Sequence, residues 1–207
     1  MELQSTGWEI AGASGAQVMA GTPIARVEIG GAHIVLPIKH TENEKLVTLK
    51  GPGAGFGLGA SISVPFVNGS YSHEDFPASK IGSIYQGLSR SNGGVYTEAD
   101  FNGGVLVKTL TAGKQISANV SAAMWFDAPV EACMARMSCS REEFFQIMEN
   151  VIVSYVRGKF NAVGVGVHTM ERFMKSVKAV GFFSGLSLET QLIGASVDAF
   201  VYNVSSS

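Results

Sequence analysis

The sequence predicts an α+β protein that is mainly β. We expect an antiparallel, glycine-rich sheet, folded as a sandwich or a barrel, with a helical hairpin inserted at about residues 128–157. Two observations predict the sheet: small and apolar residues alternate strictly over residues 53–64, and glycine-rich turn signals separate many short apolar runs. The helical hairpin is predicted by a capped, amphipathic segment after residue 140.

The 207 residues suit one compact domain, 1–207, of a size that β-rich folds commonly reach. Charged residues make up only 15% of the chain, against about 25% in an average soluble domain. Small polar residues must therefore cover the surface, or part of it is buried in an assembly or against a membrane. The net charge of −2 and the absence of a long Lys/Arg run disfavour nucleic acid as a partner.

Candidate strands are the short apolar runs 8–10, 17–19, 24–29, 33–38, 45–49, 55–66, 81–86, 104–110, 116–126, 162–167 and 186–193. Residues that tolerate positive φ, as hairpin turns require, stand between several of them, at Gly30-Gly31, Asn68-Gly69, Asn92-Gly93-Gly94 and Asn102-Gly103. We therefore expect a meander of antiparallel hairpins.

The segment from Gly53 to Val64 has one bare backbone face, because every second residue is glycine or serine. Glycine weakens a strand unless a neighbour gains from the missing side chain. The bare face thus predicts close approach by another sheet, a helix, a lipid or a second subunit. Segments 116–124 and 162–167 alternate in a similar way, so the small faces are expected to stack together or to line a narrow lumen.

The best-signalled helix spans about residues 141–157. Ser140 and Glu143 form a capping box before it, and Gly158 stands where a terminating glycine is expected. Its apolar residues recur at three- and four-residue steps, which predicts a core-facing stripe, with a membrane-surface or partner-binding helix as the alternative.

Two shorter helices are expected beside it. Residues 130–137 follow an Asp-Ala-Pro sequence that is typical of a helix start. Residues 169–179 form the other, and it carries the densest basic cluster of the chain, Arg172, Lys175 and Lys178. This cluster is either a solvated face or a binding surface.

No motif indicates catalysis or metal binding. Cys133 and Cys139 fit neither a redox pair nor a zinc site, and we expect them to be small buried or half-buried residues, with a disulfide as the alternative. The four histidines lack metal-ligand spacing. The cluster His73-Glu74-Asp75 is either a polar loop or the place of a general base. We predict no catalytic residue, no metal site and no cofactor, while a dispersed active site stays open.

The sequence shows neither a signal peptide nor a run of 18 apolar residues. We expect a soluble chain, cytoplasmic or exported, that reaches a membrane at most peripherally. Removal of a signal peptide would leave the same pattern.

The C-terminal run from Lys178 to Glu189, followed by Asp198-Ala199 and Tyr202, resembles the closing motif of the SYLF lipid-binding domain. Segments 55–60 and 112–123 resemble its Phe-Gly-Leu strand and its strand rich in glycine, alanine and serine. The resemblance implies a β-rich domain that binds phospholipid headgroups at a membrane surface without catalysis.

The first functional hypothesis is therefore a non-enzymatic binding module for an anionic lipid surface. Each cation beside such a surface contributes about 1 kcal/mol, and aromatic rings enter the interface. The expected site residues are Lys159, Arg172, Lys175, Lys178, Phe182 and Phe183. Two alternatives stay open: a self-associating, homo-oligomeric structural or secretion-associated β protein, and an effector or pore-forming toxin that inserts segment 53–64 into a membrane.

Overall fold

A computed structural model describes residues 3–21, 27–59, 82–87, 94–114, 116–157, 167–188 and 195–207. Within these residues the chain is mainly β. The strands are β1 (Ser5–Ile10), β2 (Ser14–Gly21), β3 (Val27–His40), β4 (Leu46–Gly59), β5 (Ser83–Gln86), β6 (Gly103–Lys114), β7 (Ile116–Phe126), β8 (Val177–Leu188) and β9 (Ala195–Ser206). The helices are α1 (Val130–Met137), α2 (Arg141–Arg157) and α3 (Val167–Ser176), with a 3-10 helix, η5 (Glu98–Phe101).

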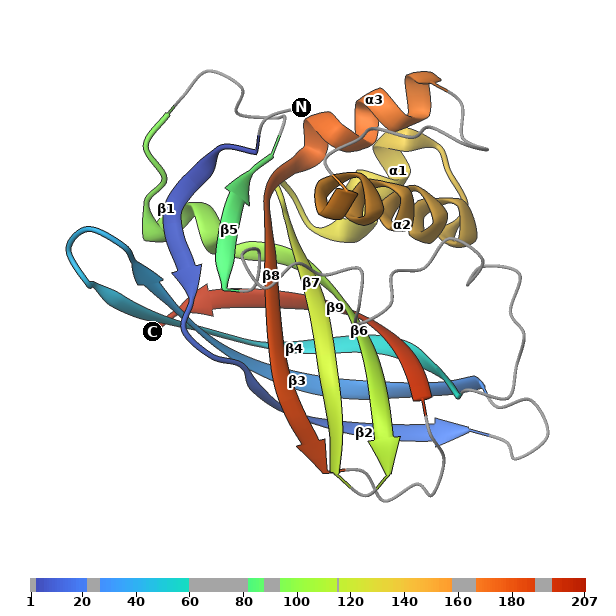
Figure 1. The fold of residues 1–207 in the computed structure, drawn as a ribbon. Coiled ribbons are helices and arrows are strands. Elements are labelled where there is room, and N and C mark those ends of the chain that lie inside the picture. The colour runs from blue at the N-terminus through green and yellow to red at the C-terminus, as the bar shows by residue number, and fades with distance from the viewer. Residues whose placement is uncertain are drawn as a thin grey trace.

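The strands form one antiparallel sheet in the order β1-β5-β8-β7-β6-β9-β4-β3-β2 (Figure 1). β3 closes this sheet, because its end also pairs with β1, from Trp8 opposite His40 to Ile10 opposite Ile38. Eight strands thus make a closed barrel, and β2 pairs with the remaining part of β3. The predicted antiparallel architecture is confirmed, in its barrel form.

The inserted helical hairpin is also confirmed, as α1 and α2. Ser140 and Glu143 form the predicted capping box: the Glu143 carboxylate accepts from the Ser140 N–H at 2.8 Å, and the Ser140 hydroxyl accepts from the Glu143 N–H at 3.2 Å. Figure 1 shows the three helices grouped on one side of the barrel. None of the helices in the described residues is both long and apolar enough to cross a bilayer.

The predicted turn at Gly30-Gly31 is wrong. β3 runs through both residues, with Gly30 opposite Met19 and Gly31 opposite Val18 on β2. On its other edge the same glycines pair with β4, and neither has a positive φ. Pairing along both edges outweighs the local glycine signal, and the chain turns instead after His40.

The other predicted turns have different outcomes. Asn102-Gly103 does not join two strands, because it links η5 to β6. Gly103 there has a φ of 111°, which suits glycine. Asn68-Gly69 and Asn92-Gly93 lie outside the described residues.

The C-terminal third differs most from expectation. α3 ends at Ser176, and β8 begins directly at Val177, where the sequence predicts continued helix to residue 179. β9 is a strand that the sequence does not predict. The candidate strand 162–167 lies outside the described residues apart from Val167, which starts α3.

Two hydrophobic cores lie on opposite faces of the barrel wall. The inner core takes residues from all eight barrel strands and includes Trp8, Phe101 and Trp125. The outer core lies between the helices and the outer faces of β6, β7 and β8. Neighbouring residues of one strand serve different cores, since Trp125 belongs to the inner core and Phe126 to the outer one.

The glycine face of β4 lies against another strand of the same chain at Gly53 and Gly55. A Cβ added to Gly55 would lie 2.7 Å from the Phe200 Cα, and one added to Gly53 would lie 2.7 Å from the Val201 carbonyl oxygen. Both neighbours belong to β9, which pairs with β4, so the glycines let the two strands lie closer together than side chains permit. The neighbour at these two glycines is the adjacent strand of the same sheet, and not the second sheet, helix, lipid or second subunit that the sequence predicts.

Candidate functional site

A half-open groove of about 450 Å³ lies between the helical hairpin and the outer face of the barrel. We call it the hairpin groove. β4, β9 and the start of β6 form its floor, and α1 with the first turn of α2 forms its roof. Its volume falls within the roughly 300–1,000 Å³ that is typical of small-ligand sites.

Gly104 determines how closely the roof approaches the floor. A Cβ at this position would lie 2.8 Å from the Ala128 carbonyl oxygen and 3.1 Å from the Val130 nitrogen. The missing side chain therefore lets the start of α1 rest directly on β6. Gly104 pairs with Asn203 across β6 and β9, so Asn203 marks the end of the groove that lies beneath the start of α1.

The groove is polar at this end and apolar further along. Glu131, in the first turn of α1, and Asn203 are exposed lining residues. The floor continues with Val201 and Ala54, which face each other across β9 and β4. Half-buried Met134 completes the apolar part from the side of α1.

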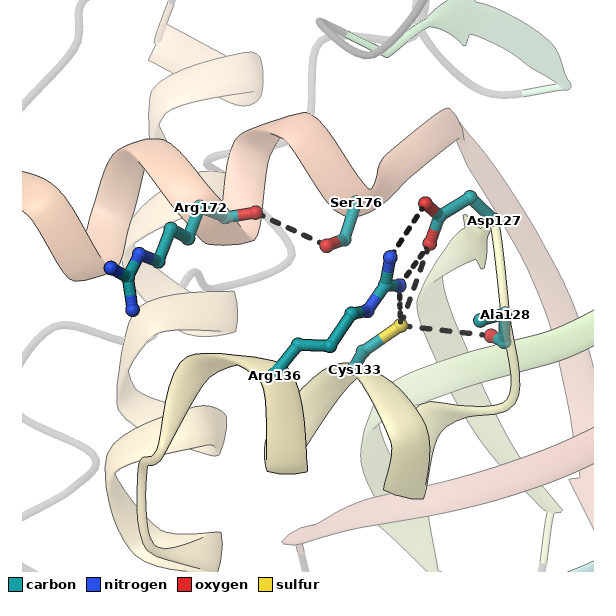
Figure 2. Close-up of polar contacts among 6 residues, drawn as sticks. All are labelled: Asp127, Ala128, Cys133, Arg136, Arg172 and Ser176. Carbon is teal, nitrogen blue, oxygen red and sulfur yellow. Dashed lines mark hydrogen bonds and ion pairs between the residues drawn. The ribbon is translucent and has the colours of Figure 1, made fainter.

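A polar clamp holds the hairpin in place (Figure 2). Arg136 on α1 donates to both carboxylate oxygens of Asp127, at 3.1 Å from Nη1 and 2.5 Å from Nη2. Asp127 follows β7, and its N–H donates to the Ser176 carbonyl oxygen at 3.0 Å, at the end of α3. The clamp thus joins α1, β7 and α3 at one point, and it fixes the roof of the groove.

Cys133 adds a thiol to this clamp, with its Sγ 3.1 Å from the Arg136 Nη2. Burial raises the pKa of the Cys133 thiol, and the hydrogen bond from Arg136 lowers it by less. A buried, protonated thiol is a poor nucleophile, which makes Cys133 a structural residue. Burial likewise raises the pKa of Cys139. Both cysteines are free, one buried and one half-buried, as the sequence predicts.

Two other kinds of site were considered from the sequence, a metal site and a general base. No three His, Cys, Asp or Glu side chains gather there in a way that can hold a metal ion. The cluster His73-Glu74-Asp75 lies outside that part.

Of the six residues predicted to bind lipid, the five that the structure describes do not line the hairpin groove. Lys159 lies outside the described residues. Arg172 and Lys175 are exposed on α3, and Lys175 donates to Glu171 at 2.7 Å. That contact lowers the pKa of Glu171, which keeps a negative charge beside the cations. Lys178, on β8, is half-buried and donates to the Asn102 carbonyl oxygen at 3.3 Å.

Phe182 and Phe183 are buried, with 0% and 8% of their surfaces exposed. The first belongs to the outer core and the second to the inner core. The prediction that these rings enter a membrane interface is wrong for this fold, because neighbouring strand residues point to opposite faces and both faces of β8 are covered at these two residues.

Sequence reasoning missed the residues of the hairpin groove. Ala54, Glu131 and Val201 are far apart in the chain, and only the pairing of β4 with β9 and the docking of α1 bring them together. A function must be inferred from this geometry, because no family model matches the chain and no curated protein or solved structure shows significant similarity to it.

Proposed function

We propose that this protein is a non-enzymatic binding module that holds the apolar part of a lipid, or of another small apolar molecule, in the hairpin groove. The observation that carries this proposal is a half-open groove of about 450 Å³ whose inner lining is apolar. Transfer of a ligand methylene from water to such a lining contributes about 0.8 kcal/mol.

The groove is built to keep its shape without a ligand. β4 and β9 pair from Leu49 to Gly59 beneath it. The contact at Gly104 and the bidentate pair between Asp127 and Arg136 hold its roof. Such preorganisation lowers the entropy cost of binding.

Attachment to an anionic lipid surface stays a prediction. The exposed cations Arg172 and Lys175 support it, and the charge of Glu171 offsets them. If the prediction holds, the protein co-sediments with anionic vesicles, salt weakens this binding, and an R172A/K175A variant loses most of it. Equal binding to neutral vesicles would contradict the prediction. The self-associating and pore-forming alternatives also stay predictions.

The groove proposal is tested with N-phenyl-1-naphthylamine, an uncharged dye that fluoresces in apolar surroundings. Wild-type protein should raise its fluorescence in a saturable way. Ala54→Phe places a ring on the exposed floor of the groove and should weaken binding at least about fivefold. Lys50→Phe is the matched control, because Lys50 is an exposed residue of the same strand outside the groove lining.

The two variants separate groove binding from unspecific adsorption. Lys50→Phe should bind the dye as the wild type does. An absence of saturable binding, or equal dye affinity in the two variants, would overturn the proposed function.

A further inference from the structure

The polar end of the hairpin groove carries a negative charge. Glu131 lines this end and is exposed, and no described residue forms an ion pair or a side-chain hydrogen bond with it. Asn203, also at this end, offers an amide with both an acceptor oxygen and a donor NH₂ group. A ligand that enters the groove therefore meets a carboxylate and an amide before it reaches the apolar lining.

The nearby cations whose side chains the structure describes do not cancel this charge. Arg136, also on α1, is committed to Asp127 through two hydrogen bonds. Lys108, on β6, is only 7% exposed and already interacts with another residue. Lys50 is exposed on β4 but does not line the groove. Among the described lining residues, Glu131 is the only charged one.

We propose that the ligand is an amphiphile with a protonated amine at its polar end, and that molecules ending in a carboxylate or phosphate are disfavoured. This inference rests on the proposed function. The ammonium group donates to the Glu131 carboxylate and to the Asn203 amide oxygen, and the apolar chain extends along Val201, Ala54 and Met134.

The test compares three ten-carbon molecules that differ only in their polar end: decylamine, decanol and decanoate. Each displaces the bound dye at neutral pH and low salt, below its micelle concentration. Glu131 should attract the ammonium group of decylamine and repel the carboxylate of decanoate. We therefore expect decylamine to bind about three- to tenfold more tightly than decanoate, with decanol between them. Added salt should reduce the difference.

Glu131→Gln removes the charge and keeps the shape, so it should bring the affinities for decylamine and decanoate together. Glu42→Gln is the control, because it changes the net charge equally at an exposed residue outside the groove lining, and it should keep the wild-type preference. Circular dichroism of both variants verifies that they are folded.

The outcomes separate this inference from the proposed function. If all three molecules displace the dye with equal affinity, or if Glu131→Gln keeps the preference for the amine, the inference is overturned and the groove remains a binding site. If none of the three displaces a dye that binds saturably, the inference is overturned and the groove remains a site for the dye. If the dye itself shows no saturable binding, the proposed function and the inference both fail.

Discussion

Replacement of Gly55 by alanine tests how β4 and β9 pack. Gly55 is buried, and an added methyl group would lie 2.7 Å from both the Phe200 Cα and the Phe200 Cδ1, with the Ala199 carbonyl oxygen closer still. Ordinary van der Waals contact begins at 3.4 Å. The two strands must therefore move apart by about 0.7 Å or more, and a backbone neighbour cannot rotate away as a side chain can.

Overpacking of a well-packed core typically costs about 1–3 kcal/mol. Because backbone atoms set the limit here, we expect the upper part of this range, about 2–3 kcal/mol. For a chain of this size, each kcal/mol lowers the melting temperature by about 2–4 °C. Gly55→Ala should therefore melt about 4–12 °C below the wild type.

Thermal unfolding, followed by circular dichroism, measures this difference. Gly94→Ala is the matched control, because nothing lies within 4 Å of an added Cβ at this exposed residue. It should change the free energy of unfolding by less than about 0.5 kcal/mol. A Gly55→Ala variant that melts with the wild type would refute the close packing of β9 against β4.

Three further predictions concern β3, the clamp and the cysteines. Gly31→Ala should leave the melting temperature unchanged or raise it, because an added Cβ at this strand residue stays 4.0 Å from its nearest neighbour; a large decrease in melting temperature would indicate a turn at this residue in place of the strand. Arg136→Lys should cost about 0.5–1 kcal/mol in urea unfolding, since lysine cannot form the bidentate pair with half-exposed Asp127, and wild-type stability would show that the pair contributes nothing. Burial raises the pKa of the folded Cys133 thiol above its ordinary value of 9.0, so this group stabilises the fold below pH 9.0 and loses that contribution as the pH rises through the folded pKa. In native protein iodoacetamide should thus modify Cys139 before Cys133, as mass spectrometry reads out, and equal rates would contradict the burial of Cys133.

Short sequence patterns predicted those strands and helices that depend mainly on residues close together in the chain. The candidate strand at residues 116–126 matches the bounds of β7, and the capping box at Ser140 marks the start of α2. The turn at Gly30-Gly31 was wrong because glycine tolerates turns and strands alike, and only pairing with β2 and β4 decides between them. β9 has no comparable alternation signal, and its place between β4 and β6 depends on contacts that are distant in sequence.

The candidate site was less predictable than the fold. Phe182 and Phe183 were expected at a membrane because aromatic rings beside cations suit an interface, but a strand covered on both faces buries both rings. Gly104 carries no motif, and its role appears only when α1 is seen to rest on β6. Sequence reasoning thus identified the glycine-rich strand that forms part of the groove floor, but it did not identify the groove.

NMR of protein labelled at its methionine methyl groups tests the central claim most directly, because Met134 lines the hairpin groove while Met124 is fully buried outside its lining. As decylamine is added, the Met134 signal should shift in a saturable way and the Met124 signal should stay in place. A ligand that binds without moving the Met134 signal would contradict the assignment of the hairpin groove as the binding site.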